Sequence, residues 1–70
     1  MNKKEFGLNL AKLREKTGLS AYELSMRLGK DSTYINKIEN GLRFPSVAMV
    51  FEIANALNIE PSQLFQNSIN

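Results

Sequence analysis

Four polar side chains that could do chemistry lie within six consecutive positions: Ser32, Thr33, Asn36 and Lys37. On a helix, residues three and four apart are neighbours, so these side chains would share one face. Hydroxyl, carboxamide and ammonium groups of this kind can hydrogen-bond to the edges of DNA bases. This segment is therefore the first candidate for a functional surface, provided that the rest of the chain folds so as to hold it in place.

Other kinds of chemistry are limited by the composition of the 70-residue chain, which contains neither cysteine nor histidine. Their absence removes disulfides, thiolate and imidazole catalysis, and every metal site built from those ligands. Carboxylates remain, but a chain this short leaves little room for a substrate cleft. We therefore predict no enzyme, no cofactor and no metal site.

The basic residues are unevenly distributed. All nine Lys and Arg residues lie in positions 1–43 with five acidic residues, whereas positions 44–70 contain only Glu52 and Glu60. One end of the domain could thus present a positive face to a polyanion. Ordinary charge scatter on a solvated helical surface is the alternative.

No stretch approaches the roughly 20 apolar residues of a membrane span, and no signal-peptide pattern is visible. We expect no membrane association and a cytoplasmic location at the nucleoid.

Turn-forming residues divide the chain into five segments with helical apolar spacing. We expect helices at about 3–16, 20–28, 32–40 and 46–57, and a short fifth one from Pro61. Gly18 should end the first helix as a C-terminal cap, Ser20 and Ser46 should cap the starts of the second and fourth helices, and Asp31 or Ser32 the start of the third. The expected buried residues are Phe6, Leu10, Leu13, Leu24, Leu28, Ile35, Ile38, Val50, Ile53, Ala54, Leu57, Leu64 and Phe65. The prediction is an all-α, compact five-helix bundle forming one domain over 1–70, with a core at about 6–66 and a frayed tail at 67–70.

The second and third helices would be joined by about three residues around Gly29, which is the arrangement of a helix-turn-helix. Leu24 and Leu28 would pack on the third helix, and Gly29 would allow a sharp turn with positive φ. Ser25 must be small, because the two helices cross there at close range.

The same region resembles a known family, the phage-repressor/Cro-type or XRE-type helix-turn-helix regulators, over about 6–65. The resemblance rests on the segments LREKTGLS (13–20), ELS (23–25), LG (28–29), YINKIENG (34–41) and PS (45–46). It implies a lambda-repressor-like DNA-binding domain whose third helix enters the major groove, usually as a homodimer on a palindromic operator.

By this resemblance, Ser32, Thr33, Asn36 and Lys37 would contact bases. Phosphate contacts would come from the five residues Ala21, Tyr22, Lys30, Tyr34 and Arg43, the first two through backbone N–H groups at a helix N-terminus. The alternative for Tyr34 is partial packing against the second helix. For Arg43 the alternatives are a cation in the minor groove and a solvated loop charge. The resemblance also implies a structural ion pair between Arg14 and Glu39.

The chain departs from the usual family pattern at three positions. Ala21 stands where glutamine commonly bonds a phosphate, and Lys30 stands where an apolar residue is frequent. Ser25 replaces the usual alanine, and local bonding to the backbone can absorb its hydroxyl. None of these changes is expected to break the fold.

The function predicted from the sequence is sequence-specific binding of double-stranded DNA as a small transcriptional regulator, a dimeric repressor on a palindromic operator. Leu64, Phe65 and Ile69 are candidates for the dimer interface, with core burial as the alternative for the first two. The alternative function is an antitoxin-type interaction module that binds a protein partner, such as a toxin or an anti-repressor, and autoregulates its operon.

Overall fold

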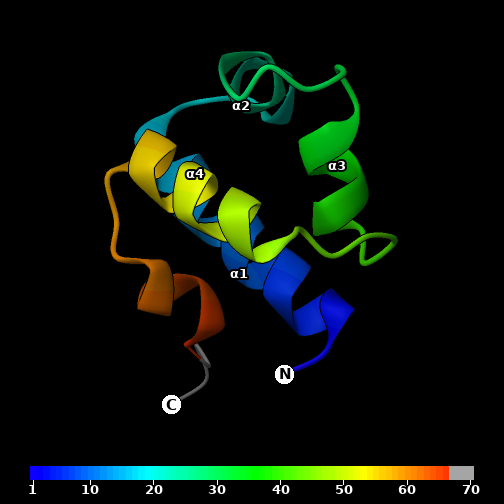
Figure 1. Ribbon diagram of the computed structural model, residues 1–70, viewed down its shortest axis with the longest axis vertical. Helices are drawn as coiled ribbons and strands as arrows, with labels where there is room; N and C mark the ends of the chain where they lie inside the picture. The colour runs from blue at the N-terminus through cyan, green and yellow to red at the C-terminus, as the bar shows by residue number, and fades with distance from the viewer. Residues whose placement is uncertain (67–70) are drawn as a thin grey trace.

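Four α-helices and one 3-10 helix make up residues 1–66, the part of the chain that the computed structural model describes (Figure 1). They are α1 (Lys3–Thr17), α2 (Ala21–Arg27), α3 (Tyr34–Glu39), α4 (Val47–Leu57) and η1 (Pro61–Phe65). In Figure 1, α2 lies at one end of the molecule, whereas the N-terminus and η1 lie toward the other. The all-α prediction is confirmed. Positions 67–70, where we expected a frayed tail and the interface candidate Ile69, lie outside the described residues.

Helix ends that the sequence marked with caps are found where we expected them. Ser20 Oγ accepts from Glu23 N at 3.0 Å, and the Glu23 carboxylate accepts from Ser20 N at 2.8 Å, which completes a capping box on α2. Ser46 Oγ accepts from Met49 N at 3.2 Å at the start of α4. Gly18 ends α1 in the left-handed region, with φ of 81°. Local sequence therefore fixes these boundaries.

The start of the third helix was predicted wrongly, since neither Asp31 nor Ser32 caps it. The Asp31 carboxylate instead accepts from Thr33 N at 3.0 Å and from Thr33 Oγ1 at 2.8 Å, which closes a local turn ahead of the helix. The helix consequently begins only at Tyr34, and residues 28–33 form the connection. This connection is longer than the three residues we expected, although Gly29 adopts the expected positive φ of 71°.

The fifth helix is a 3-10 helix, so residues 1–66 contain four α-helices and a 3-10 turn rather than five α-helices. Pro61 occupies its first turn as expected, but the chain becomes extended at Gln66, with φ of −78° and ψ of 135°. The buried Asn9 of α1 holds this end: its Nδ2 donates to the carbonyl of Leu64 at 3.3 Å and to that of Gln66. Through these two bonds, Asn9 ties the C-terminal end of η1 to α1.

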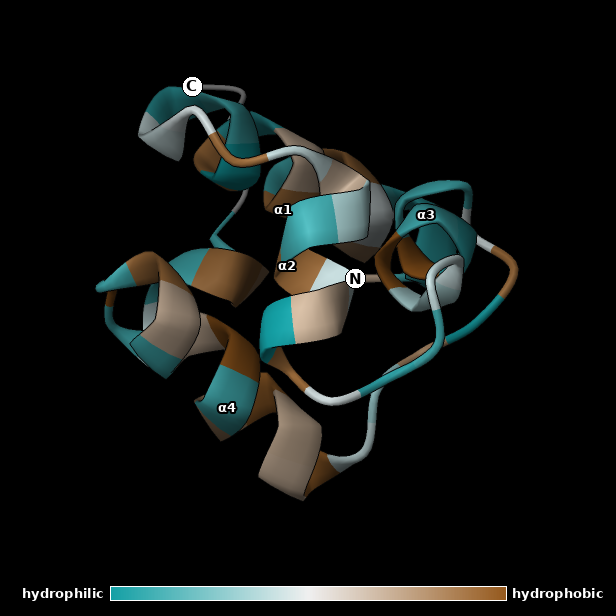
Figure 2. Cartoon of the chain, turned by 90° about the horizontal axis from the view of Figure 1, so that it is seen from above, coloured by the Kyte–Doolittle hydropathy of each residue, from teal (hydrophilic) through white to brown (hydrophobic). Residues whose placement is uncertain are grey.

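One apolar core lies between the helices. Its fully or nearly fully buried members are Phe6, Leu10, Leu24, Tyr34, Ile35, Ile38, Val50, Ile53, Ala54, Leu57 and Leu64. Leu13 and Leu28 pack against this core while only partly buried, and Phe65, for which core burial was one of two alternatives, is 44% exposed. Hydrophobic and hydrophilic stretches alternate along the helices in Figure 2, as expected for amphipathic helices around a shared core.

Candidate nucleic-acid interface

The outer face of α3 carries the side chains that the sequence singled out. Tyr34, Ile35 and Ile38 are buried, with exposed fractions of 2%, 0% and 0%. The side chains expected to contact bases are all exposed: Ser32, Thr33, Asn36 and Lys37. Ser32 and Thr33 lie just before the first helical turn, and Asn36 and Lys37 lie within the helix. The structure therefore brings the four together at one end and one side of α3.

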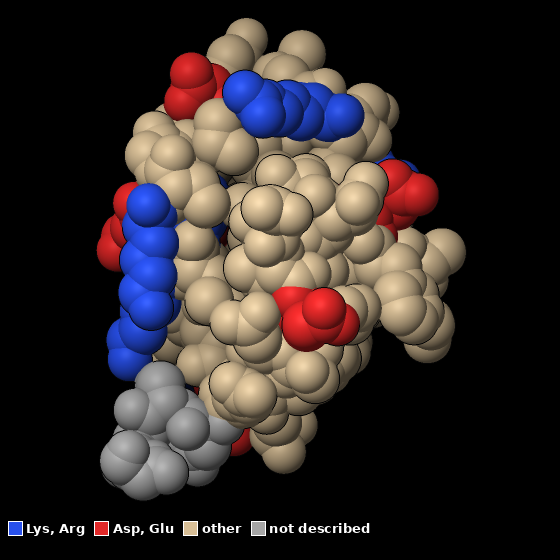
Figure 3. Space-filling model, turned by 90° about the vertical axis from the view of Figure 1, so that its left-hand side faces the viewer, with Lys and Arg blue, Asp and Glu red and all other residues tan. Residues whose placement is uncertain are grey.

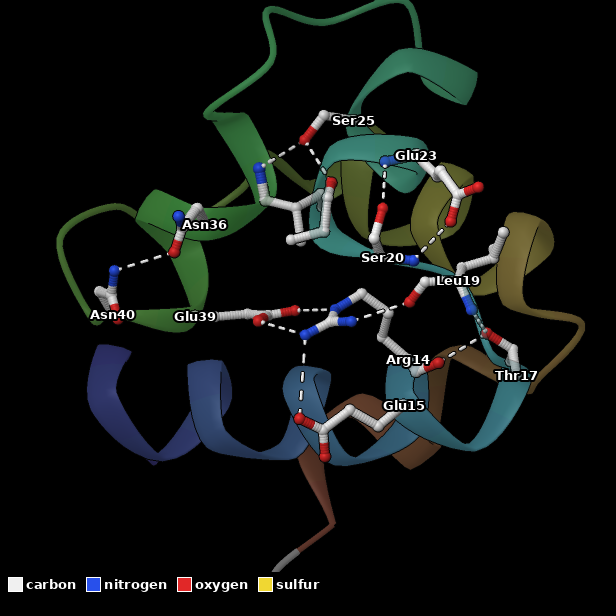
Figure 4. Close-up of polar contacts among 12 residues, drawn as sticks. Arg14, Glu15, Thr17, Leu19, Ser20, Glu23, Ser25, Asn36, Glu39 and Asn40 are labelled. Carbon is white, nitrogen blue, oxygen red and sulfur yellow. Dashed lines mark hydrogen bonds and ion pairs between the residues drawn. The ribbon is translucent and has the colours of Figure 1, made fainter.

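Two of these side chains are already oriented by hydrogen bonds. The Thr33 hydroxyl donates to Asp31, so its free lone pairs make it an acceptor toward any ligand. The pKa of the Asp31 carboxyl is lowered, first by the hydrogen bond from the Thr33 hydroxyl and then by that from the Thr33 backbone N–H. Asn36 Oδ1 accepts from Asn40 Nδ2 at 3.0 Å (Figure 4), which leaves the Asn36 amide as a donor.

An ion pair joins α1 to the C-terminal end of α3. Arg14 Nε lies 2.6 Å from Glu39 Oε2, and Nη2 lies 3.0 Å from Oε1, so the pair is bidentate (Figure 4). Arg14 Nη1 also donates to the carbonyl of Leu19 at 2.8 Å. The Glu39 hydrogen bond is the main cause of the raised pKa of Arg14. With both side chains 13% or less exposed, the guanidinium lies inside the molecule and links three segments.

Tyr34 is a buried residue with two cations against its ring. Lys30 Nζ lies 5.4 Å from the ring centroid and Arg43 Cζ lies 4.9 Å from it, both within the range of cation–π attraction. Burial raises the pKa of the Tyr34 hydroxyl, and the charge of Arg43 opposes that rise. The structure thus gathers Lys30 and Arg43 beside the first turn of α3. A phosphate contact by the Tyr34 hydroxyl stays a prediction.

The N-terminus of α2 presents the other expected backbone contacts. Ala21 and Tyr22 are its first two residues, and the side chain of Tyr22 is 59% exposed. Glu23 binds the N–H of Ser20 in the capping box, and this bond from the Ser20 backbone is the main cause of its lowered pKa. A negative charge therefore lies close to the N–H groups of Ala21 and Tyr22 and weakens their attraction for a phosphate.

Gly7 supports this interface but was not recognised from the sequence. A Cβ atom at Gly7 would lie 2.3 Å from the carbonyl oxygen of Ile38 and 2.8 Å from that of Glu39. Only glycine therefore lets α1 approach the C-terminal end of α3 so closely. An isolated glycine inside a helical pattern was the available signal.

A separate apolar groove lies between the start of α4 and η1, with a volume of about 350 Å³. It is lined by Phe44, Pro45, Val47, Val50, Phe51, Pro61, Ser62 and Phe65. Val47 and Phe51 are 75% and 58% exposed, and Phe44 and Phe65 are 43% and 44% exposed. Of the two described interface candidates, Leu64 is buried in the core, whereas Phe65 contributes to this groove.

Other kinds of site are not found in the described residues. Residues 1–66 contain no cluster of three or more acidic residues suited to holding a metal ion. Within that range no helix has the length and apolarity needed to cross a membrane.

The α2–turn–α3 geometry, with a buried inner face and an exposed polar outer face on α3, defines a helix-turn-helix domain of the lambda-repressor-like class. Residues 10–64 match the family described as helix-turn-helix. The chain belongs to this family, the XRE-type helix-turn-helix regulators, and is a DNA-binding transcriptional regulator. Membership of this non-enzymatic family agrees with the prediction that the chain is not an enzyme.

Two known proteins illustrate the relationship. The chain is 36% identical over 62 residues to the uncharacterized HTH-type transcriptional regulator y4dJ of Sinorhizobium fredii (strain NBRC 101917 / NGR234), covering 89% of this chain and 80% of that protein. The crystal structure of the restriction-modification controller protein C.AhdI from Aeromonas hydrophila superposes with a TM-score of 0.84 at 38% identity. That match covers 90% of this chain and 91% of C.AhdI.

Proposed function

We propose that this regulator is a repressor that binds a palindromic operator as a homodimer, with the outer face of α3 reading the bases. The observation that carries the proposal is the exposure of Ser32, Thr33, Asn36 and Lys37 opposite the buried Ile35 and Ile38. In this arrangement the Asn36 amide and the Lys37 ammonium are donors, which suit acceptors in the major groove such as guanine N7 and O6. A single domain over 1–70, working on the nucleoid in the cytoplasm, is the simplest form of this regulator.

The phosphate contacts we propose flank this face. Lys30 and Arg43 lie beside the Tyr34 ring, one before α3 and one after it, so both could bind phosphates of the DNA backbone at the edge of the major groove. Ala21 and Tyr22 would add backbone N–H groups at the N-terminus of α2. Neutralised phosphates release counterions, so binding should weaken steeply as salt concentration rises.

A homodimer is proposed because a six-residue recognition helix reaches too few base pairs for useful specificity. The groove beside α4 offers an interface: α4 has only Glu52 and Asn55 as polar residues, and brown colour dominates it in Figure 2. Figure 3 shows one face of the molecule that is mostly uncharged, with basic side chains near its top and left edges and an acidic one near its middle. Two copies of the groove facing each other across a two-fold axis would bury Phe51 and Phe65.

Selection from a random duplex library tests the proposal. The purified protein is incubated with the library at near-physiological salt, and the retained DNA is sequenced. The expected result is an enriched inverted repeat whose half-sites lie about 34 Å, or one helical turn, apart. Folded protein that enriches no sequence would refute operator-specific binding.

An antitoxin-type interaction module is the second candidate, and the same exposed groove favours it, because a partner protein could occupy it in place of a second copy. Light scattering on the purified chain separates the two occupants. A dimer supports the repressor proposal, whereas a monomer that becomes a stoichiometric complex with a neighbouring gene product supports the module. The likeness to a controller protein favours the regulator over the interaction module.

A further inference from the structure

The recognition helix α3 has no cap of its own. Its N-cap residue, Thr33, makes no side-chain hydrogen bond to the helix, and its hydroxyl donates instead to Asp31. The helix has six residues, and helices of this length are unstable unless other elements hold them. The first backbone N–H groups of a helix need partners from outside it. Tyr34 N donates to the carbonyl of Asp31 at 3.2 Å. The next N–H, that of Ile35, has its partner in another element.

That partner is Ser25 of α2. Ile35 N donates to Ser25 Oγ at 3.0 Å, and the Ser25 hydroxyl in turn donates to the carbonyl of Ala21 at 2.9 Å (Figure 4). Ser25 is fully buried, with 0% of its surface exposed, so water cannot take over either bond. The hydroxyl therefore joins the backbone of α2 to the first turn of α3 through one continuous hydrogen-bonded chain.

We propose that Ser25 is a positioning residue for DNA recognition, whose hydroxyl fixes the N-terminal end of α3 at the angle at which its outer face reads bases. The inference rests on the proposed base-reading function of α3. An alanine at position 25 would offer no acceptor for the Ile35 N–H. This chain thus has a tie between its two helices that an alanine would lack.

The two ends of α3 are held by different elements, which gives Ser25 a specific effect. The C-terminal end is held from α1, by Arg14 on Glu39 and by the close approach of Gly7 to Ile38. Ser25 holds the N-terminal end from α2. Removing its hydroxyl leaves a buried N–H without a partner, and the first turn must shift or open to find one. The adjacent outer-face residues would move with it.

The experiment compares Ser25→Ala with Ser46→Ala, a matched control that deletes a hydroxyl bonded to a helix N–H at the start of α4. Each protein is kept at a temperature where circular dichroism shows it fully folded. The readout is the ratio of affinity for the selected operator to affinity for scrambled duplex. Because a displaced first turn would lose a base contact, this ratio should fall about tenfold in Ser25→Ala. Ser46→Ala should keep the wild-type ratio. An unchanged ratio in Ser25→Ala, or an equal loss in Ser46→Ala, would overturn the proposal.

A second measurement needs no DNA. Amide hydrogen exchange should show the Ile35 N–H of the wild-type protein exchanging as slowly as core amides of α4, and about tenfold faster or more in Ser25→Ala. Rapid exchange of Ile35 in the wild-type protein would overturn the bond itself. If the wild-type protein selects no operator, the proposed function fails and the recognition role of Ser25 fails with it. If the wild-type protein selects one and Ser25→Ala retains its specificity, only the role of Ser25 fails.

Discussion

Substituting Gly7 by alanine tests how α1 holds the recognition helix. The added Cβ would lie 2.3 Å from the carbonyl oxygen of Ile38 and 2.8 Å from that of Glu39. Ordinary contacts begin near 3.4 Å, so the two helices must separate by about 1 Å. Because both clashing atoms belong to backbone, no side-chain rotation can relieve the overlap.

Two opposing effects set the size of the change. Alanine is a better helix former than glycine, which should favour the variant by about 1 kcal/mol. Overpacking costs about 1–3 kcal/mol, and a clash with rigid backbone belongs at the upper end of that range. The free energy of unfolding should therefore fall by about 2 kcal/mol, the difference between about 3 and about 1.

Urea denaturation followed by circular dichroism measures this difference. Gly18→Ala is the control, because it makes the same substitution at the other end of α1, where an added Cβ meets nothing within 4 Å. Its φ of 81° makes that variant costly through backbone strain alone, by about 1 kcal/mol. Gly7→Ala should be the less stable of the two. A Gly7→Ala protein as stable as the wild type would refute the close approach of α1 to α3.

Three further predictions concern the ion pair, the groove and the turn. Arg14→Ala should lower the free energy of unfolding in urea by about 2 kcal/mol or more, because the mostly buried carboxylate of Glu39 loses its partner, and operator affinity should fall with it. Unchanged unfolding with lost binding would instead make Arg14 a direct DNA contact. Phe51→Glu should give a folded protein that is monomeric by light scattering and binds the operator weakly in a gel-shift assay. Leu8→Glu, at a side chain that is 53% exposed and lies outside the groove, should stay dimeric. A dimeric Phe51→Glu protein would argue against the groove as the interface. The pKa of the Asp31 carboxyl, lowered by the hydrogen bonds from Thr33, should be found by NMR titration below the ordinary value of an aspartate. The stabilising effect of these bonds is complete above that ordinary pKa and is lost as pH falls through the lowered one. A midpoint at or above the ordinary value would count against these hydrogen bonds.

The features that the sequence predicted correctly depend on short-range physics. Ser20 with Glu23, Ser46, and Gly18 act through groups three or fewer residues away, so a pattern in the sequence suffices to locate them. The buried pair Ile35 and Ile38 followed from helical periodicity. The same periodicity placed the polar side chains of 32–37 on the opposite, exposed face.

The features that were missed depend on contacts between distant segments or on competition between local bonds. Asp31 could cap a helix or bind Thr33, and the sequence cannot rank these two choices. Gly7 is required only because the end of α3 packs against it, 31 residues further along the chain at Ile38. Ser25 likewise gains its partner Ile35 only once α2 and α3 have packed. Such residues emerge from the tertiary structure, since their partners are not neighbours in sequence.

The central claim, that the outer face of α3 reads bases, is tested most directly by repeating the library selection with Asn36→Ala and Lys37→Ala. We predict that each variant still enriches an inverted repeat but loses its preference at one position in each half-site, because one base contact is missing. Retention of the wild-type base preferences with uniformly weaker binding would contradict the claim and would make these side chains phosphate contacts.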